Sequence, residues 1–210
     1  MMDTKEAMQR MAEGRLYLSM DEGILAVQLD CLEKLYDFNA TRPHDREKRR
    51  EMLAGMLAEI GENCYVEPPL HANWGGAHVH FGSNVYANFG LTLVDDGHIY
   101  VGDNVKFGPH VTIATAGHPI DPELRPTGLQ YNADVHIGSG VWVGAGAVIL
   151  PGVTIGDNTV VGAGSVVTKD LPANVVAVGN PCRVMRPIGP KDKETYFRGR
   201  PIDVTLEDLK

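Results

Sequence analysis

Apolar side chains recur every six residues along the C-terminal half of the chain. This row consists of Ile137, Val143, Ile149, Ile155, Val161 and Val167, and glycine follows it at Gly138, Gly144, Gly156 and Gly162. A period of six matches neither the period of about 3.6 of a helix nor the period of about 2 of a half-buried strand. It predicts a solenoid in which each six-residue unit forms one short strand and one tight corner, with one side chain pointing inward.

The same phase occurs upstream, and one segment interrupts it. Its upstream members are Phe81, Val101, Phe107 and Ile113. Ile113 and Ile137 are 24 residues apart, a multiple of six, so the segment between them can leave the solenoid without a change of register. This extended loop, at about 114–134, contains Gly117-His118-Pro119. Loops on rigid scaffolds often carry function, so we expect the chemistry here.

A smaller interruption lies between Leu93 and Val101, where the chain has two residues more than the rhythm requires. The extra residues fall around Asp95 and Asp96. An insertion of this kind in a solenoid forms a bulge or a small loop. We therefore expect both carboxylates to be exposed to solvent.

Helical periodicity precedes the solenoid. Three amphipathic helices are predicted, the first from the capping box of Asp3 to Gly14, the second after a similar box at Ser19, and the third from about Pro43 to Ile60. The charged run 46–51 is expected to form the solvated face of the third helix. We therefore expect a helical N-terminal region over residues 1–61, a β-helix over 62–186 and a polar, partly ordered tail over 187–210.

Composition narrows the class of protein. The chain has 210 residues with 43% apolar content, enough to bury a core, and its net charge of -8 argues against general nucleic-acid binding, which needs a basic surface. Cys31, Cys64 and Cys182 lack the spacing of a CxxC pair, which suits a reducing compartment. No run approaches about 18 consecutive apolar residues and no apolar leader is present. We expect a cytoplasmic protein that binds no membrane.

An ordered set of motifs resembles the maltose and galactoside O-acetyltransferases. It includes Tyr86-Ala87-Asn88-Phe89, Gly117-His118-Pro119, Val141-Trp142-Val143-Gly144, Val167-Thr168-Lys169-Asp170 and Gly179-Asn180-Pro181. The resemblance extends from about Gly14 to Arg186. It implies an all-β solenoid that is a left-handed parallel β-helix of hexapeptide repeats, a homotrimer, acetyl-CoA as donor and no metal requirement. The handedness comes from the resemblance alone, because parallel crossovers are usually right-handed.

The implied chemistry needs a base. Moving an acetyl group from a thioester to a hydroxyl requires a group that takes the hydroxyl proton and a donor for the developing oxyanion. Imidazole suits the first role because it titrates near neutral pH. Of the eight histidines only His118 lies on the loop, and it matches the family's catalytic base. Without the resemblance, a single loop histidine is ordinarily surface decoration.

The resemblance also implies binding residues on the acceptor side. Asn88 and Asp96 match positions that bind acceptor hydroxyls, with Tyr86 close to them, and Ser19 matches a further acceptor position. The alternatives are that Asn88 satisfies backbone groups at a corner and that Asp96 is a solvated bulge residue. For Ser19 the alternative is the N-cap of the second helix.

On the donor side the family pattern maps onto Trp142, Ala145, Ala163, Thr168, Lys169, Arg183 and Arg186. From Lys169 to Arg200 the chain has seven basic and three acidic residues, a local balance of +4 that suits the phosphates of CoA or, alternatively, a flexible basic tail. Trp142 could lie along the pantetheine arm or pack on the solenoid. Some relatives have a serine at Ala145, so this chain can offer only its backbone N–H to the thioester oxygen.

Two departures on the acceptor side leave the acceptor open. Relatives often have a polar residue and then a tyrosine where this chain has Trp74-Gly75, and a Met or another residue at Gln130. Trp74 could stack on a flat acceptor or fill a gap on the solenoid. Maltose, glucose, a galactoside and a nonsugar alcohol are all compatible with the sequence.

Two other classes of protein use such a solenoid. A metal-dependent hydratase of the carbonic anhydrase type needs three His ligands, and here the expected pair five residues apart is missing, since His110 and His118 are eight apart. His78 and His80 are interpreted as exterior residues. A noncatalytic trimeric scaffold is disfavoured by the presence of His118, Asn88 and Lys169 together.

Overall fold

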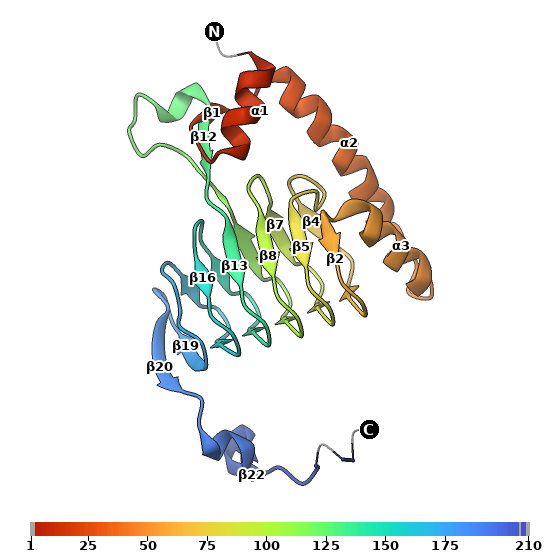
Figure 1. Cartoon of the computed structure of the whole chain (residues 1–210), viewed down its shortest axis with the longest axis vertical. Coiled ribbons are helices and arrows are strands. Elements are labelled where there is room, and N and C mark those ends of the chain that lie inside the picture. Colours follow the sequence, from red (N-terminus) through yellow and green to blue (C-terminus); the bar gives the residue numbers. More distant parts are fainter. Residues whose placement is uncertain (1–2, 206, 209–210) are drawn as a thin grey trace.

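The computed structural model describes residues 3–205 and 207–208. Three helices lie at one end of a β-solenoid, and a small hairpin follows its other end (Figure 1). The helices are α1 (Thr4–Ala12), α2 (Glu22–Asn39) and α3 (Arg46–Met56). Within the described ranges, none of them combines the length and the apolar content that a bilayer crossing would require.

The first two helices begin at aspartate caps. The Asp3 carboxylate accepts from the backbone of α1, and Gly14 follows the helix with a left-handed φ of 66°, as predicted. The cap of α2 is Asp21, whose carboxylate accepts from two amides of the first turn. The interpretation of Ser19 as this cap is therefore wrong. The Ser19 hydroxyl instead donates to the carbonyl of Gly128 in the loop, at 3.0 Å.

The third helix is shorter than predicted. It ends at Met56 because Leu57 is extended, and the last residues of the expected helix form strand β2 (Glu59–Ile60), which pairs with the solenoid. Its charged run is also not wholly solvated. Arg49 is buried and donates to the hydroxyls of Thr41 and Tyr65, so its charge is held by oxygen acceptors under the helix.

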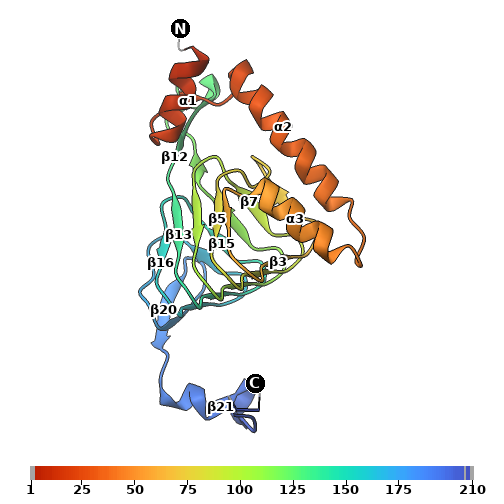
Figure 2. The same cartoon turned by 45° about the vertical axis from the view of Figure 1, so that its right-hand side comes forward.

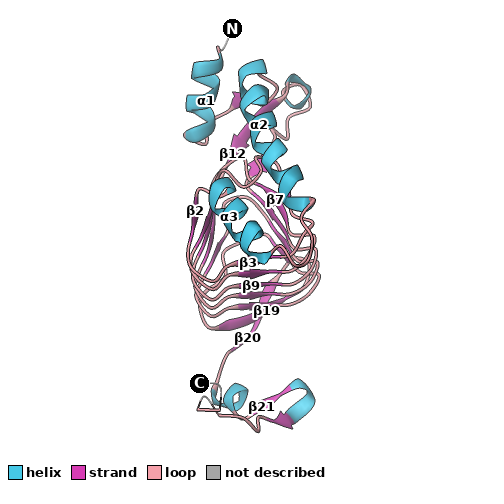
Figure 3. Cartoon of the chain, turned by 90° about the vertical axis from the view of Figure 1, so that its right-hand side faces the viewer, coloured by secondary structure: helices cyan, strands magenta, loops and turns pink. Residues whose placement is uncertain are grey.

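Short strands fall in turn on three sheets, which form the faces of a triangular prism (Figures 2 and 3). The first sheet contains β2, β5 (Val79–Phe81), β8 (Ile99–Val101), β13 (Val135–Ile137) and β16 (Thr154–Ile155). The second contains β3 (Tyr65–Val66), β6 (Tyr86–Ala87), β9 (Lys106–Phe107), β14 (Trp142–Val143), β17 (Val160–Val161), β19 (Val175–Val178) and β20 (Arg183–Pro187). The third contains β4 (His71–Ala72), β7 (Thr92–Val94), β10 (Thr112–Ala114), β15 (Val148–Ile149) and β18 (Val166–Val167). Within these three sheets all described pairs are parallel except β19 with β20, so the predicted β-helix is confirmed.

The hexapeptide row forms the core of the prism. Every member of the row, from Phe81 to Val167, is buried and belongs to one continuous apolar cluster. Asparagines stabilise the corners between the first and second sheets. Asn84 and Asn104 adopt left-handed φ angles of 60° and 58°, which asparagine tolerates well, and their side-chain amides hydrogen-bond from coil to coil at 3.2 Å.

The loop leaves the prism between β10 and β13 and returns to the N-terminal region. It contains β11 (Ala116–Gly117), the 3₁₀ turn η1 (Arg125–Thr127) and β12 (Leu129–Asn132). β12 is the central strand of an antiparallel sheet between β11 and β1 (Tyr17–Leu18). The loop is therefore anchored on a segment that lies more than a hundred residues earlier in the sequence.

The tail after the solenoid contains short ordered elements. These are the 3₁₀ turns η2 (Pro190–Lys193) and η3 (Phe197–Gly199) and the strands β21 (Thr195–Tyr196) and β22 (Arg200–Pro201). The two strands pair in antiparallel fashion. The part of the expected tail beyond residue 208, and residue 206, lie outside the described residues.

The close stacking of coils predicts that Gly144 tolerates no side chain. A Cβ added there would lie 2.5 Å from the backbone nitrogen of Ala163 in the next coil, so Gly144→Ala should lower the free energy of unfolding by about 1–3 kcal/mol. Gly55→Ala is the matched control, because an added Cβ in α3 meets nothing within 4 Å, and it should raise stability by about 0.5–1 kcal/mol. Guanidinium unfolding measures both, and a Gly144→Ala protein of unchanged stability would contradict the stacking argument.

Candidate functional site

The residues predicted from the sequence lie at two different edges of the prism. We call the corner between the third and first sheets the loop edge; it carries Trp74, Asp96 and the loop with His118. We call the corner between the second and third sheets the Asn88 edge, which also carries Ala145 and Ala163. The third sheet separates these edges, so one chain does not bring Asn88 and His118 together.

The imidazole of His118 is exposed and held by one hydrogen bond. Its Nδ1 lies 2.8 Å from the carbonyl oxygen of Leu129 in β12. A carbonyl only accepts, so Nδ1 carries the proton, and in the neutral ring Nε2 keeps its lone pair. The loop therefore presents His118 in the tautomer that a general base needs, with the basic nitrogen directed away from its anchor.

Asp96 is buried rather than solvated, which corrects the expectation from the sequence. Its side chain is 7% exposed, and its two oxygens accept from the side-chain amides of Asn73, at 2.9 Å, and Gln130, at 3.0 Å. The indole nitrogen of Trp74 lies 3.4 Å from the same carboxylate. The bulge folds inward because neighbouring coils and β12 supply neutral donors for the charge. A ligand can therefore contact Asp96 only where Asn73, Gln130 and Trp74 leave its carboxylate uncovered.

Gln130 connects this carboxylate to the N-terminal region. Its side-chain nitrogen donates to the hydroxyl of Tyr17 as well as to Asp96, and the Tyr17 hydroxyl lies 3.4 Å from Asn132. Burial is the main reason that the pKa of Tyr17 is raised. Gln130 was recognised from the sequence as a departure from relatives, whereas the contacts of Tyr17 and Asn132 were not predicted. The alternation of apolar and polar residues from Leu129 to Asn132 was the available signal.

Asp95 and Trp74 serve the structure of the loop edge. Asp95 is fully buried and accepts from the backbone amides of Trp74, at 2.8 Å, and Gly76, at 2.9 Å. Desolvation raises the pKa of Asp95, and these hydrogen bonds oppose that shift. The Trp74 indole is 4% exposed and packs in a cluster with Met11 and Tyr17. It has no open face for an acceptor to stack on, so the gap-filling alternative holds.

The Asn88 edge is more open. Tyr86 is partly exposed and stacks on Tyr65, with ring centroids 6.4 Å apart and planes 4° from parallel. Desolvation raises the pKa of Tyr86. The side-chain oxygen of Asn88 accepts from the amide of Phe89 at 2.8 Å, as the corner alternative requires, and its nitrogen donates no hydrogen bond within the described chain. Asn88 can therefore cap its corner and still offer a donor.

The donor-side residues follow the Asn88 edge and the second sheet. Trp142 is 55% exposed on β14, so its ring is open to solvent on the outer face of the sheet and does not pack into the solenoid. Ala145 and Ala163 follow strands one coil apart, and within the described chain neither backbone amide donates to another residue. Two unpaired N–H groups in line with an open indole are suited to polar and flat parts of one elongated ligand.

The residues expected to bind the phosphates of CoA lie at the C-terminal end of the solenoid. Thr168 and Lys169 are exposed just after β18, and Arg183 is exposed at the start of β20. Arg186 already has a partner, because Asp192 makes two contacts with its guanidinium at 2.7 and 2.8 Å. This hydrogen-bonded pair lowers the pKa of Asp192 to about 2. Arg186 must share or exchange this partner to reach a phosphate.

Histidines cluster on the first sheet rather than around the loop. His78 and His80 are both partly buried, so they are not simple exterior residues, and they contact His98 of the next coil. Within the described residues, no group of three or more His, Cys, Asp or Glu side chains is placed to hold a metal ion.

The polar contact between β1 and β12 generates a stability prediction. Tyr17→Phe and Gln130→Met should each lower the free energy of unfolding by about 1–3 kcal/mol, because each removes a hydrogen bond between buried side chains. The double variant should lose less than the sum, since either change alone breaks the Tyr17–Gln130 hydrogen bond and the double change breaks it only once. Gln9→Met, at an exposed position of α1, is the control. Strictly additive losses in urea unfolding would show that the two side chains do not act together.

Two family models and several known proteins match this chain. Residues 10–61 match the family described as "Maltose acetyltransferase hexapeptide capping motif", and residues 134–169 match "Bacterial transferase hexapeptide (six repeats)". The chain is 51% identical to a galactoside O-acetyltransferase of Lactococcus lactis subsp. lactis, over 95% of this chain and 96% of the relative. It is 47% identical to the galactoside O-acetyltransferase of Escherichia coli, over 94% and 97%.

A solved structure gives the same result for the fold. The structure of a galactoside acetyltransferase in complex with coenzyme A matches with a TM-score of 0.90 and 46% sequence identity, over 94% of this chain and 98% of that one. A match over 94% of the chain extends beyond the solenoid alone. The chain therefore belongs to the maltose and galactoside O-acetyltransferase family of hexapeptide-repeat transferases.

Proposed function

We propose that this protein is an acetyl-CoA-dependent O-acetyltransferase that transfers an acetyl group to a hydroxyl of a sugar of the maltose, glucose or galactoside type. The observation that carries the proposal is His118, whose Nδ1 is fixed by the Leu129 carbonyl and whose Nε2 is open on the loop. Relatives at 47–51% identity are named galactoside O-acetyltransferases, and a solved structural neighbour contains coenzyme A.

His118 acts as the general base. Its Nε2 takes the proton of the acceptor hydroxyl while that oxygen attacks the thioester carbonyl. The negative charge that develops on the carbonyl oxygen requires a donor, and the unpaired backbone N–H of Ala145 is the group this chain offers. When the carbon–sulfur bond breaks, the imidazolium returns the proton to the departing thiolate. The hydrogen bond to Leu129 holds the ring throughout.

The donor lies along the Asn88 edge and the second sheet. The open Trp142 ring supports the apolar stretch of the pantetheine arm, and the Ala163 amide binds one of its polar groups. Thr168, Lys169 and Arg183 bind the phosphates, together with Arg186 when it exchanges Asp192 for a phosphate. Local positive charge of this kind is needed because the whole chain carries a net charge of -8.

The complete site requires a second copy of the chain, and we propose a homotrimer. One copy supplies Tyr86 and Asn88, and its neighbour supplies Ser19, Asp96 and His118, because these groups lie at different edges of one prism. Ile120 of the loop is 90% exposed, which supports burial of this side chain against another subunit. A cytoplasmic location fits the three cysteines, all of which are free thiols.

The first functional prediction concerns His118. His118→Ala should lower kcat by about 100-fold or more, because general-base assistance contributes about 10²- to 10⁴-fold. Free thiol released from acetyl-CoA is measured with maltose, glucose and a galactoside as acceptors. His44→Ala, at an exposed position between α2 and α3, is the control and should retain full activity. A His118→Ala protein with normal melting temperature and more than a tenth of the wild-type kcat would refute the assignment.

The second functional prediction tests the shared site. His118→Ala and Asn88→Ala trimers should each be nearly inactive, whereas trimers refolded from an equal mixture of both should regain activity. A neighbouring pair then combines an intact His118 with an intact Asn88 at about a quarter of the sites. Refolding each variant alone is the control. If the mixed trimers stay as inactive as the separate variants, the two residues do not meet across subunits.

A further inference from the structure

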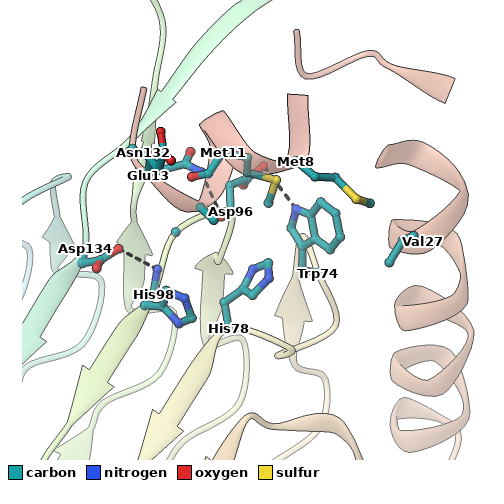
Figure 4. Close-up of a pocket in the computed structure, with 13 residues that line it drawn as sticks. Met8, Met11, Glu13, Val27, Trp74, His78, Asp96, His98, Asn132 and Asp134 are labelled. Carbon is teal, nitrogen blue, oxygen red and sulfur yellow. Dashed lines mark hydrogen bonds between the residues drawn. The ribbon is translucent and has the colours of Figure 1, made fainter. Parts of the chain in front are cut away.

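A cavity of about 420 Å³ lies beside the loop edge, between α1, α2 and the start of the first sheet (Figure 4). His118 is not among the residues that line it, although Asp96 and Asn132 belong to its wall. The remaining wall combines methionines of α1, Val27 of α2 and the edge of Trp74 with two imidazoles and two carboxylates. The cavity is therefore partly apolar, partly polar and distinct from the position of the base.

The first imidazole, that of His78, presents an acceptor. Its Nδ1 lies 2.7 Å from the backbone carbonyl of Asp95, which can only accept, so Nδ1 carries the proton. In the neutral ring Nε2 is then unprotonated. His78 therefore offers a lone pair and no further N–H to a molecule in the cavity.

The second imidazole, that of His98, also presents an acceptor, and its tautomer follows from contacts that run through His80 to Glu59. Nδ1 of His80 lies 3.0 Å from a carboxylate oxygen of Glu59 without the geometry of a hydrogen bond, and the negative charge of this carboxylate favours the proton on Nδ1. With His80 neutral, its Nε2 accepts from Nδ1 of His98, at 2.9 Å. Nε2 of His98 is thus also an acceptor. Burial lowers the pKa of His98, against the opposing effect of the Asp134 carboxylate, and this favours the neutral form.

The carboxylates of the wall add negative charge. Asp134 accepts from the amide of His98 through one oxygen, and Asp96 is satisfied only by neutral donors. Neither forms an ion pair with a basic side chain within the described residues. The C-terminus of α1, the negative end of its dipole, points to the same space, with Glu13 beside it. Glu13 is partly offset by Arg15, at 3.1 Å.

The donors of the wall are already used. The indole N–H of Trp74 is directed at Asp96, and the side-chain nitrogen of Asn132 donates to the carbonyl of Asp96 at 2.9 Å. The amide of Gly97 donates to the hydroxyl of Thr115 at 2.8 Å. A molecule in the cavity therefore meets acceptors and negative charge, and its own groups must supply the hydrogen-bond donors.

We propose that this cavity is a binding site for an organic ammonium ion with an apolar body. The ammonium supplies N–H donors to His78, His98 and Asp134 and compensates the negative charge, and the apolar body packs on the methionines and Val27, beside the edge of Trp74. A neutral alcohol of the same shape has only one donor and leaves the charge uncompensated. The proposal concerns binding alone and holds whether or not acetyl transfer occurs as proposed above.

Titration calorimetry of the full chain with benzylamine and benzyl alcohol, in the presence of EDTA, tests this site. Benzylamine should bind saturably with a Kd at least about tenfold lower than that of benzyl alcohol. Asp134→Asn should remove most of this preference, because its amide oxygen can still accept from His98 but its charge is lost. Asp30→Asn, on the exposed face of α2, is the matched control and should bind benzylamine as the wild type does.

A second measurement locates the binding. In Trp142→Phe protein, Trp74 is the only tryptophan, and benzylamine should change its fluorescence with the same midpoint. Val27→Trp, which fills the apolar wall, should abolish saturable binding in the calorimeter. Equal affinity for amine and alcohol, no saturable binding of benzylamine, or equal effects of Asp134→Asn and Asp30→Asn would each overturn the proposal.

Discussion

The structure depends on the distance between stacked coils. At corners such as those of Gly108 and Gly156 the backbones of neighbouring coils approach closely, and an added Cβ would lie 2.6 Å and 2.4 Å, respectively, from an amide nitrogen of the next coil. Glycine permits this approach, and the inward apolar side chains then form one continuous column. The resulting prism has fixed edges. Groups that share an edge keep their spacing without any contact between their side chains.

The loop is the one large departure from this regular stack, and its position depends on the N-terminal region. β12 pairs with β1 on one side and with β11 on the other, and the buried contacts of Gln130 and Asn132 hold it further. The residue before Gln130 is Leu129, whose carbonyl fixes the imidazole of His118. The helical region is therefore part of the scaffold that orients the candidate base, in addition to closing the end of the solenoid.

Burial of charge at the loop edge follows one rule. Asp95 and Asp96 are surrounded by backbone amides, side-chain amides and an indole, without a basic partner in the described residues. Hydrogen bonds to a carboxylate are stronger than neutral ones and offset part of its desolvation. The same arrangement uses up the donors of the wall. For this reason the neighbouring cavity presents acceptors and negative charge to whatever enters it.

The sequence by itself determined the β-helix, its inward row and the site of the loop, because a six-residue period is a local relation that survives in any tertiary context. It also placed His118 on that loop. It could not show that Asp96 is buried, since its partner Gln130 is 34 residues away and meets it only when β12 folds back on β1. The third helix was likewise predicted to be too long, because the pairing of Glu59 with His80 in the solenoid overrides the local preference of these residues for a helix. Only the tertiary structure decided which groups share an edge. Residues become neighbours at an edge when the chain turns the same corner of the prism in successive coils, and spacing along the sequence does not show which corner a residue occupies.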